Sequence, residues 1–385
     1  MVPEVSLSLH VDTARTWRGG QNQVLLTVLG LRAMGHRAVL VAHGEGELHR
    51  RAREGPDLVA LAPRNEVDLS AAWKLSRIIR EFKPSIVHAH DPHAVSMAAL
   101  ALSFNAPAPP PALVASRRVD FHLQKHSFSR WKYRQVDLFI AASNAIRDVL
   151  THDGIPARDI VVVHDGIDVG KIGRLPSQDL RVELWLPHGA PVIVNVGALV
   201  GHKGQKYLIQ AMPLVLHDVP DAHLIILGEG ELRPALERQM RELHLEKHIL
   251  LPGFRTDVLQ LMKTADLFAM SSVTEGLGST VLDAMAMKLA VVATSAGGIP
   301  EAVAHGVTGL LVAPGHPEDL AAAMVSLLKD PARRARMGAA GLARVSEQFG
   351  VGQMLQGTLN AYERASRAVA GSAPRAEPTH RRDRA

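Results

Sequence analysis

Short runs of apolar residues alternate with longer stretches whose apolar residues recur at helical spacing along most of this chain. The short runs predict buried strands, and the longer stretches predict helices such as Gln21–Met34, Leu69–Phe82 and Ala94–Phe104. Strands that alternate with helices indicate βαβ units and a parallel sheet. The strands predicted in the first half are Val5–Val11, Ala38–Ala42, Leu58–Leu61, Ile86–His90, Ala112–Ala115, Leu138–Ala142 and Ile160–Val163.

The same alternation begins again at about Pro191, after a polar stretch with Gly170, Gly173 and Pro176 that is predicted to be a hinge. The strands predicted there are Val192–Val196, Leu224–Leu227, His248–Leu251, Leu267–Met270 and Ala290–Ala293. Residues from about 318 to 367 are predicted to be all helical, and the polar residues 371–385 to be disordered. We expect two Rossmann-like α/β domains that face each other across a cleft, where open α/β sheets bind ligands.

Length and composition agree with this division. A chain of 385 residues is longer than a domain with a single hydrophobic core usually is. A content of 47% hydrophobic and 21% charged residues is typical of a globular protein. The absence of cysteine excludes disulfides and thiolate metal sites, which is consistent with a reducing cytoplasm. No secretory signal is visible, and no apolar run approaches the ~20 residues that span a bilayer. We expect a cytoplasmic protein, either soluble or peripheral on the inner face of the cell membrane.

Basic residues concentrate in the segment 117–134, where aromatic residues lie between them and only Asp120 opposes them. The bases are Arg117, Arg118, Lys125, Arg130, Lys132 and Arg134. One interpretation is an element that meets anionic lipid or an acidic acceptor. The other is a solvated helix whose aromatic side chains pack inward. Nucleic-acid binding is not expected, because no motif for it accompanies the bases.

The segment 272–286, SVTEGLGSTVLDAMA, is the most informative for chemistry. Glu275 and Asp283 lie eight residues apart, glycines follow the first acid, and a helical pattern follows the glycines. We predict that Ser279 or Thr280 caps this helix, whose free N–H groups attract an anion. The arrangement suits a ligand with hydroxyls at both ends and phosphates in the middle, such as a nucleotide sugar.

Glycine-containing loops follow several other predicted strands. Lys203 lies between glycines just before a predicted helix, which favours a role as a phosphate counter-charge. The other loops are Arg18-Gly19-Gly20, Gly228-Glu229-Gly230 and Pro252-Gly253-Phe254. The loop after the first strand lacks the G-x-G-x-x-G spacing, which disfavours a nicotinamide enzyme, and the loop around Lys203 is not a P-loop.

Taken together, these loops resemble family 4 glycosyltransferases, the "group 1" retaining enzymes of the GT-B fold. In the second half the resemblance lies in Val196-Gly197-Ala198-Leu199, Lys203-Gly204, Ile226 to Gly230, Pro252-Gly253-Phe254, Glu275 to Met285 and Ala296 to Glu301. In the first half it lies in Arg18-Gly19-Gly20, His88-Ala89-His90-Asp91 and Asp165-Gly166-Ile167-Asp168. It implies an acceptor-side domain at 1–168, a donor-binding domain at 169–345 and a helix at 346–370 that returns to the first domain.

The resemblance also implies a role for each matching residue. Glu275 would hold hydroxyls of the donor sugar, Asp283 the ribose, and Lys203 the diphosphate. Gly20 would approach the donor phosphate, main-chain groups near Phe254 the nucleobase, and amides around Leu277–Ser279 the pyrophosphate. The implied donor-binding residues are Gly19, Gly20, Lys203, Gly230, Phe254, Glu275, Gly276, Leu277, Gly278, Ser279 and Asp283.

Three departures from the family pattern bear on these roles. Asp283 stands where the family has Glu, and Gly197-Ala198-Leu199 lacks the arginine that usually pairs with the lysine. The family's histidine after the fifth strand is replaced by a stretch containing Arg117, which can bind phosphate or steer an acceptor but cannot act as a base. The candidate catalytic residues are therefore Glu275, Lys203, Arg117 and His90, and we expect His90 on the acceptor side.

The implied reaction transfers a sugar from a nucleotide-diphosphate donor to a hydroxyl of a glycan or glycolipid, with retention at the anomeric carbon. In the family's front-face route a donor phosphate oxygen takes the proton of the acceptor. No cofactor is expected, and no metal ion, because no D-x-D element lies near the predicted cleft. We also predict that His88 and His90 point to opposite faces of their strand and cannot share a metal.

Two other functions stay open. One is a nucleotide-sugar epimerase of the same fold, and the other is an inactive subunit that binds a nucleotide sugar beside a true transferase. The donor nucleotide is not distinguished, because contacts to the base in such folds are largely main-chain. Cell-envelope polysaccharide or lipopolysaccharide synthesis is the pathway that the family and the basic segment suggest.

Overall fold

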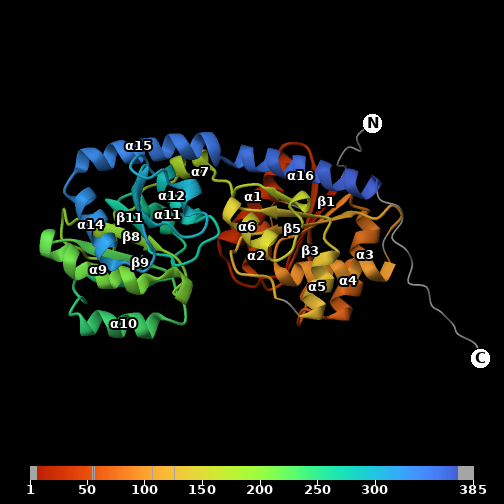
Figure 1. The fold of residues 1–385 in the computed structure, drawn as a ribbon, viewed down its shortest axis with the longest axis horizontal. Helices are drawn as coiled ribbons and strands as arrows, with labels where there is room; N and C mark the ends of the chain where they lie inside the picture. The colour runs from red at the N-terminus through yellow and green to blue at the C-terminus, as the bar shows by residue number, and fades with distance from the viewer. Residues whose placement is uncertain (1–6, 54, 56, 106, 125, 372–385) are drawn as a thin grey trace, which may run out of the picture.

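Two α/β domains lie side by side along the long axis of the computed structural model (Figure 1), and each is built around one parallel sheet. The structure describes all residues except 1–6, 54, 56, 106, 125 and 372–385. The predicted fold class is therefore confirmed. Of the tail predicted to be disordered, 372–385 lies outside the described residues, and Gly371 is the last residue of a helix.

The first sheet has seven parallel strands in the order β3-β2-β1-β4-β5-β6-β7. Its central strands β1 and β4 are fully buried and place His10 directly opposite His88. The strands are β1 Leu7–Asp12, β2 Arg37–Ala42, β3 Asp57–Ala60, β4 Ile86–Ala89, β5 Ala112–Arg117, β6 Leu138–Ala141 and β7 Ile160–Val162.

Helices cover both faces of this sheet, and α3 (Leu69–Phe82) shows how the sequence specifies them. The Asp68 side chain accepts a hydrogen bond from Ala71 N, and Lys83 ends the helix in a left-handed conformation. Leu75 and Ile79 lie one turn apart and pack into the core. The other helices are α1 Gly19–Ala33, α2 Glu47–Ala52, α4 Pro92–Asn105, α5 Ser127–Arg134, α6 Asn144–His152 and the 3₁₀ turn Ala157–Asp159.

The second sheet has six parallel strands in the order β10-β9-β8-β11-β12-β13. Its strands are β8 Val192–Val196, β9 His223–Leu227, β10 Ile249–Gly253, β11 Leu267–Met270, β12 Ala290–Thr294 and β13 Gly309–Val312. Its helices are α7 Val169–Arg174, α8 Leu180–Glu183, α9 Gln205–Asp218, α10 Arg233–Glu242, α11 Val258–Met262, α12 Ser279–Ala286, α13 Ile299–Ala302 and the 3₁₀ turn Gly201–Lys203.

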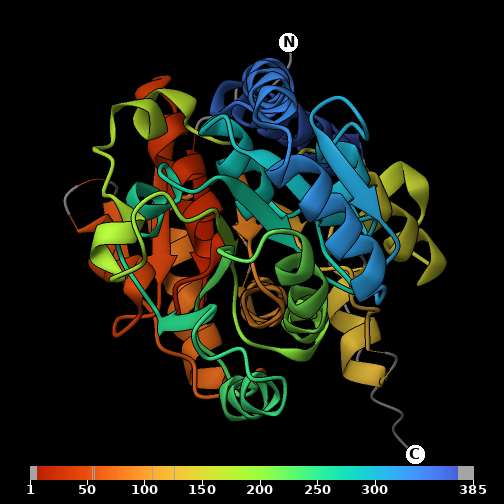
Figure 2. The ribbon, with the colours of Figure 1, turned by 90° about the vertical axis from the view of Figure 1, so that its left-hand side faces the viewer.

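Three helices end the described chain: α14 Pro317–Leu328, α15 Pro331–Gln348 and α16 Val351–Gly371. Figure 2 looks along the long axis and shows α15, in blue, at the upper edge of the second domain and α10, in green, at its lower edge. The chain crosses between the domains twice, and the crossings pair where Ile167 N donates to Phe349 O at 2.8 Å and Val351 N donates to Ile167 O at 3.1 Å.

After the second crossing, α16 packs on α1 and β5 of the first domain (Figure 1). Leu355 and Tyr362 of α16 are buried in that domain's core. Among the described residues, no helix combines the length and the apolar character needed to span a bilayer.

Candidate functional site

An ion pair joins two residues that lie 72 positions apart in the loops after β8 and β11. Lys203 Nζ lies 2.5 Å from Glu275 Oε2, and Ser272 Oγ donates to the same oxygen at 3.1 Å. Their side chains are 20% and 13% exposed. The structure thus brings together the predicted sugar-binding acid and the predicted phosphate-binding base, each neutralising the other.

The loop Gly276–Gly278 leads from Glu275 into helix α12. The prediction that Ser279 or Thr280 caps this helix is wrong. Gly278 is the N-cap, in a left-handed conformation (φ 84°, ψ 61°) that favours glycine, and no side chain caps the helix. Val281 N donates to Gly278 O at 2.8 Å, and no side chain of the described residues accepts from the first-turn N–H groups, so this helix start is of the kind that attracts anions.

Asp283 lies in the second turn of α12, where the ionised form of its carboxyl group is unfavourable. Its side chain is partly buried, and its carboxylate has no hydrogen-bond or ion-pair partner in the described part of the chain. Burial raises the pKa of Asp283 from 3.8 to about 7. A hydrogen-bond donor, such as a hydroxyl of a ligand, would stabilise the ionised carboxylate.

The other glycine loops of the second domain bring backbone segments close together. A Cβ on Gly230 would lie 2.3 Å from Leu199 O, and one on Gly228 would lie 2.0 Å from Gly197 O. Packing between loops therefore explains both glycines without a ligand. Phe254, after Gly253, is 55% exposed.

The first domain meets this site at the start of α1. A Cβ on Gly19 would lie 2.8 Å from Ser279 Oγ, whereas one on Gly20 would have no atom of the described residues within 4 Å. Ser143, the N-cap of α6, donates to Gly276 O at 2.7 Å. Loops that follow strands of both sheets therefore converge on the segment 275–279.

Three buried histidines form a cluster beneath this meeting point: His10, His88 and His90. The prediction that His88 and His90 point to opposite faces is wrong, because residues two apart on a strand share a face. Their ring centroids lie 3.9 Å apart, and one ring nitrogen from each of the three histidines lies within 4.8 Å of the others.

Every ring nitrogen of the cluster has a protein partner. His10 bonds to Ser8 Oγ and His90 Nε2, both at 3.0 Å, and His88 bonds to Tyr362 Oη at 2.7 Å and Ser116 Oγ at 2.8 Å. Burial lowers the pKa of His10 to about 3 and lowers the pKa of both other histidines well below 6.5. The rings are neutral, and their hydrogen bonds are complete as they stand.

Arg118 lies at the candidate site, although Arg117 is the arginine predicted from the sequence. Arg118 Nε donates to Asp165 Oδ1 at 2.9 Å, its Nη1 lies 3.4 Å from His90 Nδ1, and its carbonyl oxygen packs against Gly276. Arg117 instead donates to Phe121 O within the first domain. Arg118 comes directly after the last residue of β5, and adjacent residues of an extended segment point to opposite sides, which is the sequence signal that separates the two arginines.

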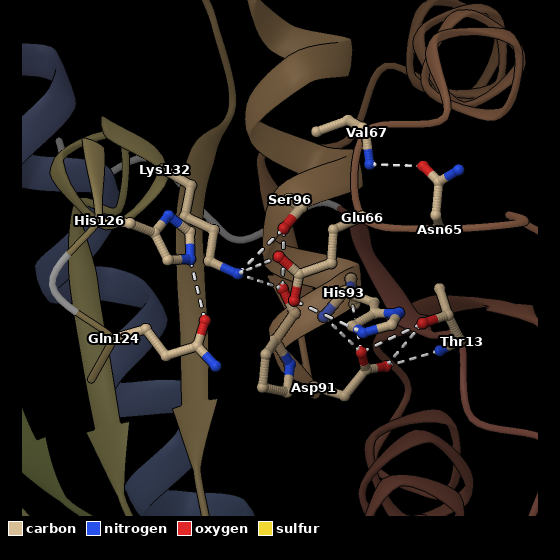
Figure 3. Close-up of polar contacts among 12 residues, drawn as sticks. Thr13, Asn65, Glu66, Val67, Asp91, His93, Ser96, Gln124, His126 and Lys132 are labelled. Atoms are coloured by element: carbon tan, nitrogen blue, oxygen red, sulfur yellow. Dashed lines mark hydrogen bonds and ion pairs between the residues drawn. The ribbon is translucent and has the colours of Figure 1, made fainter. Parts of the chain in front are cut away.

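The basic segment 117–134 is partly built into the fold (Figure 3). Lys132 is buried and donates to Ser96 Oγ and Pro92 O, both at 3.1 Å, and pairs with Glu66 Oε2 at 3.3 Å. Trp131 and Tyr133 pack against the core, as the second interpretation expects, while Phe121 is 48% exposed. Lys125 lies outside the described residues.

Figure 3 also shows Asp91, the residue after the predicted histidine motif. It accepts hydrogen bonds from Thr13 N at 2.6 Å and from His93 N at 2.8 Å. It therefore ties the end of β1 to the start of α4, so that His90 is held from both sides.

Comparisons with known proteins agree with this architecture. Residues 177–344 match the family model for glycosyl transferases group 1, and residues 17–171 match that for glycosyltransferase family 4. A curated glycogen synthase of Mycobacterium tuberculosis is 30% identical over 314 residues, which cover 77% of this chain and 72% of that protein. The chain belongs to the group 1 glycosyltransferases.

Other members of this glycosyltransferase family match over less of their length. A GDP-mannose-dependent monoacylated alpha-(1-6)-phosphatidylinositol monomannoside mannosyltransferase of Corynebacterium glutamicum is 36% identical over 194 residues, 48% of this chain and 51% of that protein. Sulfoquinovosyl transferase SQD2 of Arabidopsis thaliana is 29% identical over 348 residues, 84% of this chain and 66% of that protein.

Among solved structures, Anabaena HepE in complex with UDP and glucose superposes with a TM-score of 0.79. It is 24% identical and covers 91% of this chain and 97% of its own. A glycosyltransferase from Rickettsia africae has a TM-score of 0.81 at 20% identity, covering 95% and 99%. These similarities establish the two-domain GT-B fold.

Proposed function

We propose that this chain is a retaining glycosyltransferase that moves a sugar from a nucleotide-diphosphate donor to a hydroxyl of a glycan or glycolipid. The observation that carries the proposal is the Lys203–Glu275 pair, 2.5 Å apart beside the open start of α12. Gly19 of the other domain reaches the same helix start. A lysine, a helix start without a side-chain cap and a carboxylate thus lie together where the two domains meet.

In this proposal the protein stabilises charge rather than supplying a base. The donor diphosphate would draw Lys203 from Glu275, leaving that carboxylate free to accept hydrogen bonds from sugar hydroxyls. Lys203 and the amides of α12 would then stabilise the charge that develops on the leaving diphosphate. A donor phosphate oxygen takes the acceptor proton, and we expect no divalent cation to be required.

The acceptor side would lie at the carboxyl ends of β4 and β5. His90 is buried, so it would act on the acceptor through Arg118 rather than by direct contact. We place the reaction in cell-envelope polysaccharide or lipopolysaccharide synthesis, on the cytoplasmic face of the membrane. The exposed residues Val119, Phe121 and Arg130 of the basic segment support a peripheral contact with anionic lipid.

The test starts with a thermal-shift screen of UDP, GDP and ADP sugars, because a ligand that binds only the native state raises the unfolding temperature. The donor that binds is then assayed for transfer with EDTA present, and the anomeric configuration of the product is read by NMR. Relatives' names refer to GDP-mannose, sulfoquinovose and glycogen, which is why the screen spans several nucleotides.

Lys203→Ala and Glu275→Gln are each expected to lower kcat by about 10²–10³-fold, the usual effect of losing one preorganised group. Lys329→Ala is the matched control, because it removes a lysine–aspartate pair with Asp218 on the surface of the same domain. Binding of a nucleotide sugar with no transfer to any acceptor would support the inactive subunit. An epimerised donor sugar would support the epimerase.

A further inference from the structure

Glu301 of the second domain makes all its side-chain hydrogen bonds, within the described chain, with the first domain. It follows the Gly297-Gly298 pair and lies on the short helix α13. Its Oε2 accepts from Asn144 N at 2.9 Å, from Asn144 Nδ2 at 2.8 Å and from His164 Nε2 at 2.9 Å. Its Oε1 accepts from Ala145 N at 3.0 Å. One carboxylate thus spans the domain boundary.

These contacts hold a charged carboxylate at the start of α6. Burial alone would raise the pKa of Glu301, but the hydrogen bonds from Asn144, His164 and Ala145 outweigh it and lower the pKa. The N-terminal end of a helix also favours a negative charge. From the other side, Arg344 donates to Glu301 O and Ala302 O, both at 2.8 Å, which fixes the backbone of α13.

The glycine pair before Glu301 also contacts the loop Glu275–Gly278. Gly298 N donates to Glu275 O at 3.1 Å, and a Cβ on Gly297 would lie 1.8 Å from that oxygen. From the first domain, Ser143 Oγ donates to Gly276 O. The loop that carries Glu275 is therefore held between the glycine pair before Glu301 and the cap of the helix that Glu301 contacts.

We propose that Glu301 is a positioning residue, an interdomain clasp that holds the domains closed around the loop Glu275–Gly278. Its effect on turnover rests on the proposed function, but its effect on closure does not. Closing the clasp brings Gly19 to the start of α12 and Ser143 to Gly276 in one movement. The hydrogen bonds of a charged acceptor are strong enough to set the ratio of closed to open molecules.

The distance between the domains tests closure directly. The chain has no cysteine, so Ser127→Cys on α5 and Glu242→Cys on α10 give two exposed and selective labelling positions. Both helices lie at the lower edge in Figure 1, opposite the crossing between α15 and α16. Opening about that crossing lengthens the distance between fluorescent dyes, measured by single-molecule energy transfer.

Glu301→Gln is expected to raise the ratio of open to closed molecules by about tenfold or more, because its amide presents N–H groups to donors. Asn144→Ala, which keeps both backbone donors, should raise it less, and Glu301→Asp should restore part of the closed population. Glu318→Gln, at an exposed position of α14, is the matched control and should leave the distances unchanged. If Glu301→Gln and Glu301→Ala give the control's distances, the clasp is refuted.

Turnover separates the clasp from the proposed function. For a working transferase, Glu301→Gln should lower kcat about tenfold while the donor contacts of Lys203 and Glu275 remain. A longer dye distance in a chain that transfers no sugar from any donor refutes the proposed function and leaves the clasp supported. If the Glu301→Gln variant opens but keeps the wild-type kcat, the claim that closure positions the loop Glu275–Gly278 is overturned.

Discussion

Asp283, which is partly buried, and the fully buried histidine cluster are two polar sites with opposite hydrogen-bonding states. Asp283 has no partner for its carboxylate among the described residues, and burial raises its pKa to about 7. The cluster of His10, His88 and His90 is buried more deeply, yet each ring nitrogen has a partner. Of the two sites, and within the described chain, only the histidines have a hydrogen-bond partner for each of their polar atoms.

The difference has an energetic consequence at each site. A charged group that loses part of its hydration and gains no protein partner destabilises the fold. A completed network stabilises the fold and holds neighbouring groups in place. Asp283 therefore fits the donor-binding role that the proposed function gives it, whereas the histidines bond to Arg118 and to Tyr362 of helix α16.

The largest stability change is expected from Asp283→Asn, which removes the charge and keeps the shape. A folded-state pKa of about 7, above the unfolded 3.8, means that wild-type stability falls as pH rises from about 4 to 7. The variant avoids this loss, so at pH 8 it should be more stable by on the order of 3 kcal/mol. Chemical denaturation at pH 4, 6 and 8 measures the difference.

The same variant should bind the donor nucleotide about tenfold less tightly, because a neutral amide is a weaker acceptor for ribose hydroxyls than a carboxylate. Stability and binding then move in opposite directions. Equal stability of the two proteins at pH 8 would show that the carboxylate has a partner in solution. Unchanged nucleotide affinity would remove Asp283 from the donor site.

Tyr362→Phe tests the histidine cluster by removing one partner from its complete hydrogen-bond network. Removing the hydroxyl leaves His88 Nδ1 buried without its partner at 2.7 Å, and it should destabilise the first domain by about 1–3 kcal/mol. Hydrogen exchange of β4 and β5 should report the loss, while strands of the second sheet keep their protection. Tyr207→Phe is the control, since the Tyr207 hydroxyl has no hydrogen bond in the described chain. A loss confined to the second sheet would contradict the assignment.

The fold was readable from the sequence because apolar runs in a parallel sheet are short and continuous. The predicted bounds of α3, β8 and β11 agree with the structure to the residue. Strand β13 was missed because its four residues begin with Gly309 and form a short edge strand, which pairs only with β12.

The candidate site was readable only in part. Lys203 and Glu275 each stand in a recognisable loop, but their pairing depends on how two loops 72 residues apart fold together. The histidine cluster was not predicted, because His88 and His90, two residues apart on a strand, were assigned to opposite faces of the sheet. The contact between His88 and Tyr362 also joins residues 274 positions apart. Glu301 shows the same limit, since its partners belong to another domain. Long-range contacts decide these features, and local pattern does not encode them.

The smallest expected change separates a glycine needed for the fold from one needed for a ligand. Gly20 is the second residue of α1, and a Cβ there would meet no atom within 4 Å. Gly20→Ala should therefore leave stability unchanged or raise it by up to about 1 kcal/mol, because alanine favours helix. If the donor phosphate approaches this backbone, the methyl group should still lower kcat/KM about tenfold.

Gly352→Ala is the matched control for that variant. Gly352 is likewise the second residue of its helix, α16, and a Cβ there also meets no atom within 4 Å, but it lies outside the site. Steady-state kinetics and thermal unfolding of both variants decide the question. If both keep wild-type kcat/KM, Gly20 does not contact the donor. If only Gly20→Ala loses activity at unchanged stability, the space beside Gly20 is occupied by substrate, because the described residues place no atom there.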